Sequence, residues 1–161
     1  MKRIFESEHI DFVEVSEQLV SDYLVMVNDV EHVDRFLGGK HEAYTAEQEI
    51  AWVHKKLTRG DCVFSMIEKE SGRFIGNIEL MGPLEGEAEL GVAITAEMQD
   101  KGFGSEAIPA VIGFGFTRMG LTKIRLKTRV FNARAIHVYE KCGFHEYGRD
   151  DEHVYMEIRR E

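Results

Sequence analysis

Residues 97–107, EMQDKGFGSEA, place two glycines one residue apart, between a segment that alternates like a strand and one that is apolar like a buried helix. The alternating segment 87–94 has two faces. One carries Glu87, Glu89, Gly91 and Ala93, and the other carries Ala88, Leu90, Val92 and Ile94. The helix is expected over 103–119, ending at Gly120. Since glycines at a helix start let an anion reach the backbone N–H groups, and the helix dipole attracts it, we expect an anion-binding loop.

One interpretation of these glycines is a dinucleotide site, because GFGSEA (102–107) fits the pattern G-x-G-x-x-G/A. That fold needs its glycines directly after a strand and an acidic residue ~20 positions later. Here TAEMQDK separates Ile94 from Gly102, and the later region reads TKIRLK, without a carboxylate. The sequence therefore disfavours a dinucleotide site. A plain helix-starting glycine loop would look much the same as an anion cradle.

Hydrophobic periodicity and turn signals predict the other elements. Strands are expected at 10–15, 62–69, 74–81, 87–94 and 121–130, with turns at 70–73 and 82–86 and a closing hairpin over 145–158. Helices are expected at 19–27, at 33–37 with a stop at Gly38-Gly39, at 45–59 and at 132–143. Thr45 and Gln48 form a capping box, followed by an apolar stripe of Ile50, Val53 and Leu57. This order predicts one α/β domain over 1–161, with a mixed, mostly antiparallel sheet flanked by helices.

The composition argues against several classes of function. A net charge of −9 disfavours binding of nucleic acid, which depends on Lys and Arg. The longest nearly apolar run, 107–116, is shorter than the ~20 residues of a membrane span, and the first residues do not resemble a signal peptide. The His residues show no metal-ligand spacing, so no metal is expected. Cys62 and Cys142 lie far apart, which indicates a reduced, cytoplasmic setting, and the oligomeric state is left open.

Starting at Gln99, QDKGFG fits Q/R-x-x-G-x-G/A and resembles the pyrophosphate loop of the GNAT superfamily of N-acetyltransferases. NARAIHVYEKCGF (132–144) resembles the family segment N-x-x-A-x-x-x-Y-x-K-x-G-F, and ELGVAI (89–94) resembles its fourth strand. The first half, with IDFVEV, NDVEHVDRFL and ESGRFIGNIEL, is similar to the branch that contains ribosomal-protein and spermidine acetyltransferases. The resemblance implies the GNAT acyl-CoA N-acyltransferase fold, with splayed fourth and fifth strands, and acetyl-CoA as the co-substrate.

By this resemblance, the coenzyme lies in the gap between the two splayed strands. Backbone groups of Val92 and Ile94 are expected to pair with its pantetheine arm. Its pyrophosphate is expected to contact Gln99, Gly102, Phe103, Gly104 and Ser105. Asn132 is a good helix cap, and in the family the equivalent residue also touches the coenzyme.

Tyr139 is the candidate general acid. Acyl transfer from a thioester to a neutral amine needs no covalent enzyme intermediate, but the departing thiolate needs a proton, which a phenol can supply. Without the resemblance, Tyr139 would be interpreted as a core residue, because it shares a helix face with Ile136. Glu89 is the candidate base, with Glu87 and Glu79 as rivals. A backbone N–H near Val92 would hold the oxyanion.

The acceptor is expected to be a primary amine that arrives as a cation, because the chain is acidic and Glu87 and Glu89 share the small-residue face. A peptide or protein N-terminus, a polyamine and another small amine are all candidates. The alternative is a non-catalytic domain of the same fold that binds acyl-CoA as a sensor. Two further expectations concern the scaffold. Pro109 should kink its helix. A row of cations should form a solvated strand face: Lys123, Arg125, Lys127 and Arg129. The alternative for this row is a role in steering the anionic coenzyme, with Lys101 and Arg134 nearer its phosphates.

Overall fold

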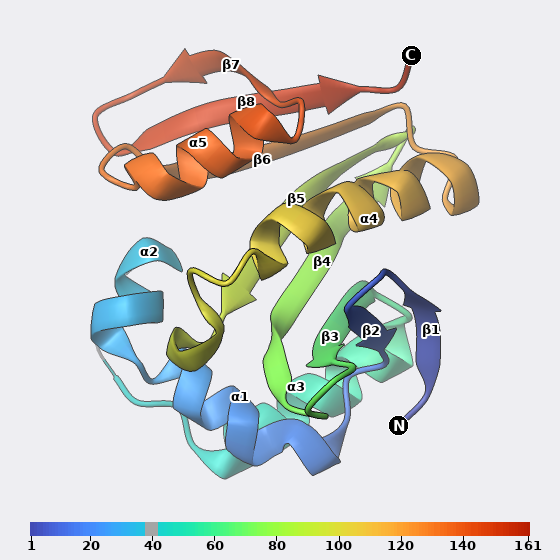
Figure 1. The fold of residues 1–161 in the computed structure, drawn as a ribbon, viewed down its shortest axis with the longest axis vertical. Helices are drawn as coiled ribbons and strands as arrows, with labels where there is room; N and C mark the ends of the chain where they lie inside the picture. The colour runs from blue at the N-terminus through green and yellow to red at the C-terminus, as the bar shows by residue number, and fades with distance from the viewer. Residues whose placement is uncertain (38–41) are drawn as a thin grey trace.

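The computed structural model describes residues 1–37 and 42–161. Within them, eight strands form one sheet in the order β1-β2-β3-β4-β5-β6-β8-β7 (Figure 1). The strands are β1 (Arg3–Glu6), β2 (Ile10–Val13), β3 (Cys62–Glu68), β4 (Phe74–Leu84), β5 (Glu87–Ile94), β6 (Lys123–Arg129), β7 (His145–Arg149) and β8 (His153–Arg159). Neighbouring strands pair antiparallel, apart from the parallel pair β5–β6. The predicted mixed, mostly antiparallel sheet is confirmed.

Helices cover both faces of the sheet and bury one apolar cluster on each. α4 (Phe103–Arg118) crosses β4 and β5 in Figure 1 and packs with the cluster that contains Leu80, Leu90 and Ile124. α5 (Ala133–Lys141) lies beside α4 on this face. α1 (Val20–Val27) and α3 (Ala46–Arg59) pack on the other cluster, which includes Val63 and Phe74. A π-helical turn (Val30–Asp34) follows α1. The short α2 (Arg35–Leu37) comes directly after this turn and lies beside β6.

Several elements form for the local reasons seen in the sequence. The capping box of α3 is confirmed: the Gln48 N–H donates to Thr45 Oγ1 (3.2 Å) and the Thr45 N–H donates to Gln48 Oε1 (2.8 Å). The predicted apolar stripe is wrong at its end, because Leu57 is 48% exposed while Val53 is fully buried. The expected stop at Gly38-Gly39 lies outside the described residues.

The largest differences from the predicted strands are a strand that was not expected and an extension of β4. β1 was not expected; its Phe5 ring stacks on Phe12 (4.2 Å between centroids) and lies edge-on to Phe64 (5.1 Å), so tertiary contacts hold a four-residue strand. β4 continues through the segment predicted as a turn, because a register shift between Met81 and Leu84 inserts an extra residue. The turn itself is confined to the two residues after Leu84.

A clasp joins the β1–β2 turn to the first helical turn of α4. The Ser7 hydroxyl donates to Glu106 Oε2 (2.5 Å), the His9 backbone N–H donates to the same oxygen (2.8 Å), and His9 Nδ1 lies 2.7 Å from Glu106 Oε1. Burial opposes ionisation of Glu106, yet these hydrogen bonds lower the pKa of its carboxyl below the ordinary 4.5. The bond to Glu106 raises the pKa of His9 above 6.5. The clasp therefore fixes the start of α4 against the N-terminal strands.

α4 continues through Pro109, which is exposed, so the hydrogen bond that the proline lacks falls on the side open to water. Further along, the helix packs closely on the sheet. A Cβ added at Gly115 would lie 3.0 Å from Leu80 Cδ1 and 3.1 Å from Leu121 Cδ1, whereas one at Gly113 would meet nothing within 4 Å. The absence of a side chain at Gly115 thus allows α4 to pack closely on the sheet, whereas a side chain at position 113 would be accommodated.

Substituting alanine at these two glycines should separate helix propensity from packing. Gly113→Ala should raise the free energy of unfolding by about 0.5–1 kcal/mol, because alanine is the better helix former. Gly115→Ala has the same gain but crowds two leucines, and overpacking typically costs ~1–3 kcal/mol. We expect urea unfolding to rank Gly115→Ala below Gly113→Ala by about 1 kcal/mol or more. Equal stabilisation by both substitutions would contradict the packing argument.

Candidate active site

The site begins where β5 and β6 separate. They pair only from Glu87 opposite Lys123 to Glu89 opposite Arg125, although β5 continues to Ile94. This confirms the predicted splay. The Thr95 N–H donates to Ile75 O on the β4 side (2.9 Å). Because backbone groups alternate in direction along a strand, those of Val92 and Ile94 turn toward the gap.

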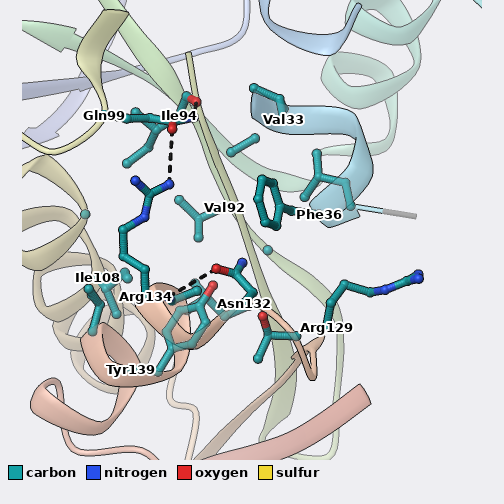
Figure 2. A pocket seen from close by; sticks show the side chains of 18 of the residues that line it. Val33, Phe36, Val92, Ile94, Gln99, Ile108, Arg129, Asn132, Arg134 and Tyr139 are labelled. Carbon is teal, nitrogen blue, oxygen red and sulfur yellow. Dashed lines mark hydrogen bonds between the residues drawn. The ribbon is translucent and has the colours of Figure 1, made fainter. Parts of the chain in front are cut away.

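A cavity of about 440 Å³ occupies this gap and has lining residues from both faces of the sheet. Phe103 and Tyr139 contribute from the α4–α5 side, and Val33 and Phe36 contribute from the side of the π-helical turn and α2. Figure 2 shows Val33 and Phe36 across the strand from Arg134, Ile108 and Tyr139. The volume is that of an ordinary small-molecule site.

The α4 end of the cavity offers backbone donors. The Glu106 N–H donates to Gly102 O (3.1 Å), so the N–H groups of Phe103, Gly104 and Ser105 precede the first hydrogen bond of the helix. Gly102 lies in the left-handed region (φ 88°), and no side chain caps this helix. A Cβ at Gly104 would meet only Ile94 Cδ1, at 3.5 Å, so the space beside these donors is open. All four residues line the cavity, as an anion cradle requires.

Gln99 braces this loop through its side chain. Its Nε2 donates to Ile94 O (2.8 Å) and His32 O (3.0 Å), while Arg134 Nη2 donates to its Oε1 (3.1 Å; Figure 2). Arg134 also pairs with Asp100 Oδ1 at 2.8 Å. Both side-chain amide hydrogens of Gln99 are therefore engaged by carbonyl oxygens, and its expected contact with the coenzyme stays a prediction.

Tyr139 lies in the cavity wall on α5, with its hydroxyl turned toward the side of Asn132 and Val92 (Figure 2). Its ring lies edge-on to Phe144, 5.9 Å between centroids. Among the described residues the hydroxyl has no hydrogen-bond partner, and burial raises the pKa of Tyr139 to about 12. Asn132 caps α5 by accepting from the Ala135 N–H (3.3 Å), as predicted, and it also lines the cavity.

The three candidate carboxylates have different surroundings. Glu89 lines the cavity at the point where the strands separate. Glu79 accepts a hydrogen bond from Lys56 Nζ (3.2 Å). Glu87 lies 3.1 Å from Lys123 Nζ, and that contact lowers the pKa of its carboxyl. The geometry therefore favours Glu89 over the other two as a base facing a bound molecule.

The sequence analysis named no site residue on the wall that lies opposite the loop before α4. Val33 and Phe36 line this wall. Both lie in NDVEHVDRFL, which carries part of the family resemblance but contains no local pattern that marks a site. Lys127, Arg129 and His153 also line the cavity. On the predicted solvated face of β6, Lys127 is exposed and the other three cations are half-buried. Strand alternation indicates the face of these side chains, but it does not indicate the cavity that Lys127 and Arg129 line.

Residues 1–37 and 42–161 contain no group of three or more His, Cys, Asp or Glu side chains arranged to hold a metal ion. No helix in these two ranges is long and apolar enough to cross a membrane. Cys62 and Cys142 are both free thiols. Burial raises the pKa of each, which disfavours the reactive thiolate at neutral pH.

Comparison with known proteins identifies the family of this arrangement. The family described as "Acetyltransferase (GNAT) domain" matches residues 10–145. The spermidine N(1)-acetyltransferase of Vibrio cholerae is 34% identical over 96 residues, which cover 58% of this chain and 56% of that protein. The chain spans about half the length of the curated relatives it matches.

Solved structures share the fold. A GNAT-family acetyltransferase from Bacillus anthracis has a TM-score of 0.83 at 20% identity, covering 96% of both chains. The Vibrio cholerae spermidine N-acetyltransferase in complex with CoA and spermine has a TM-score of 0.83 at 23% identity, covering 95% of this chain and 96% of that one. At these identities the likeness concerns the fold alone.

The cradle can be tested with a side chain placed in its open space. Gly104→Val puts a branched group beside the free N–H groups, so affinity for acetyl-CoA should fall at least ~10-fold, or ~1.4 kcal/mol. Gly113→Val is the matched control, because it makes the same change in the same helix away from the cavity. Calorimetry on both folded variants measures the effect. Unchanged affinity in Gly104→Val would mean that the anion binds elsewhere.

Proposed function

Because the chain belongs to the GNAT acetyltransferase family, we propose that it transfers an acetyl group from acetyl-CoA to a primary amine. The observation that carries this proposal is the set of backbone N–H groups that precede the first helical hydrogen bond of α4, beside the gap between β5 and β6. The acceptor is a peptide or protein N-terminus, a polyamine or another small amine. The polyamine candidate is supported by the names of relatives that are spermidine acetyltransferases. A non-catalytic sensor has no such support.

Coenzyme A fits the donors of this chain. Its pyrophosphate would accept from the N–H groups of Phe103, Gly104 and Ser105, next to Gly102 and the braced Gln99. Its pantetheine arm would pair with the gap-facing backbone of Val92 and Ile94, and Asn132 would contact it from α5. The two free thiols agree with the reduced, cytoplasmic setting that we propose for the protein.

The transfer proceeds by direct attack. The acceptor reaches the site as an ammonium ion, and Glu89 takes its proton, directly or through water. The neutral nitrogen then forms a bond to the acetyl carbon, while the Val92 N–H region stabilises the oxyanion. As the carbon–sulfur bond breaks, Tyr139 donates its proton to the sulfur, and the product nitrogen loses its surplus proton to solvent, which leaves one N–H on the amide. Tyr139 then regains a proton from solvent and Glu89 releases the one it took, so that each turnover releases one proton in total. Because burial raises the pKa of Tyr139, the phenol carries its proton at neutral pH, so the proton is in place before the sulfur leaves.

Tyr139→Phe removes only the proton donor and keeps the ring that packs on Phe144. The catalytic rate should fall by ~10²–10⁴-fold, whereas affinity for acetyl-CoA should change little. Release of free coenzyme thiol measures the rate, and calorimetry measures binding. If the variant keeps the parent rate, Tyr139 is a packing residue.

Glu89→Gln should lower the rate most at neutral pH, where an amine with a pKa near ~10 is almost wholly protonated. Raising the pH supplies the free amine without a base, so the deficit should shrink as pH rises toward 10. Glu79→Gln is the control, because the Glu79 carboxylate is held by Lys56. If the rate of Glu89→Gln is lower than the parent rate by the same factor at every pH, Glu89 is not the base.

A further inference from the structure

The four cations on one face of β6 fall into two pairs with different surroundings. Lys123 Nζ lies 3.1 Å from Glu87 and 4.0 Å from Glu157, and Arg125 lies 3.9 Å from Glu87. Lys127 and Arg129 belong to the part of β6 that has separated from β5, and both line the cavity. In the part of the chain that the structure describes, neither forms an ion pair with a carboxylate. Among the described residues, the first two cations of this face thus have carboxylate partners, whereas the last two have none.

Arg129 is held by aromatic contacts instead of by an anion. Its guanidinium carbon lies 5.6 Å from the centroid of the Phe131 ring, and that of Arg35 lies 5.2 Å from the same ring. Phe36, from the cavity wall, packs against Phe131 at 5.6 Å. Within the described ranges, the Arg129 Nε is buried without a hydrogen-bond partner. A buried donor without a partner costs free energy, and an anionic ligand beside Arg129 would recover it.

The cavity wall contains few carboxylates to balance these cations. In the described residues they are Asp100, which is paired with Arg134 in the loop before α4, and Glu89. The remaining wall therefore has one unpaired carboxylate and two unpaired cations, with His153 beside them. A polyamine, which carries only positive charge, would meet Lys127 and Arg129 unfavourably. A molecule with an ammonium group at one end and an anion at the other would complement all three side chains.

We propose that the acceptor is a primary amine that also carries an anionic group, a carboxylate or a phosphate. Glu89 receives the ammonium end, and Lys127 and Arg129 bind the anionic end. This rests on the proposed acetyl transfer and selects among its acceptors. It makes Lys127 and Arg129 specificity-determining residues of the acceptor side.

The test compares acceptors of similar length that differ at the far end: 1,4-diaminobutane, butylamine, 4-aminobutanoate and 3-aminopropyl phosphate. Spermidine and two short peptides, identical except for Glu or Lys at the second position, extend the panel to larger acceptors. Thiol release should give the highest kcat/KM with an anionic member. The carboxylate and phosphate arms show which anion is preferred. If nothing in the panel is acetylated, the proposed function fails; if a diamine, spermidine or the Lys peptide is best, only the present inference fails.

Variants on one strand face separate specificity from general effects. Lys127→Gln and Arg129→Gln should each lower kcat/KM for the best anionic acceptor at least ~10-fold, mainly through KM, and should change kcat/KM for butylamine less than ~2-fold. Lys123→Gln is the matched control on the same face, because Lys123 is paired with Glu87 and does not line the cavity. Lys127→Glu should move the preference toward 1,4-diaminobutane. Since Lys127 is exposed, its variants should fold even where Arg129→Gln does not.

Calorimetry with acetyl-CoA provides the second readout. Unchanged coenzyme affinity in Lys127→Gln, together with the KM increase, supports acceptor recognition. A fall in coenzyme affinity of the same size as the KM change would mean that these cations bind the coenzyme phosphates, and it would overturn the inference. Equal losses in Lys127→Gln and Lys123→Gln would do so as well.

Discussion

The separation of β5 from β6 is the constraint on which the site depends. A parallel pair that stops at Glu89 and Arg125 leaves the backbone groups of Val92 and Ile94 without a neighbouring strand. A sheet interior normally satisfies such groups. Here they face a cavity, and the start of α4 adds three further N–H groups on its wall. The fold thus concentrates backbone N–H groups along one cavity, which is the requirement for holding a polar, anionic molecule.

Contacts elsewhere in the molecule fix the positions of the elements that border the gap between β5 and β6. The clasp of Ser7 and His9 on Glu106 fixes the first turn of α4, and Gly115 lets the same helix lie close to the sheet. Gln99 ties the end of β5 to the turn before α2 and, through Arg134, to α5. These contacts come from distant parts of the chain and hold α4, the end of β5 and α5 in place relative to one another. The cradle is therefore preorganised by side chains that need not touch a ligand.

Local signals were sufficient for much of the fold and for half of the site. The capping box at Thr45, the Asn132 cap and the glycine loop are each encoded within a few neighbouring residues, and the structure contains all three. β1 was missed because its stability comes from Phe12 and Phe64, which are distant in sequence. The opposite cavity wall was missed for the same reason: the surroundings of Lys127 depend on where β5 leaves β6, and no local pattern records that point.

A cavity that is lined from both faces of a sheet also offers two separate places for bound molecules. The loop before α4 lies toward one face, and the turn with Val33 and Phe36 lies toward the other. In the proposed reaction the coenzyme would occupy the part of the cavity beside α4, and the acceptor would occupy the part beside Val33 and Phe36. With separate places in one cavity, neither molecule would have to leave before the other could bind. The two halves of the cavity can accordingly diverge independently during evolution, with one chemistry retained and the range of acceptors altered.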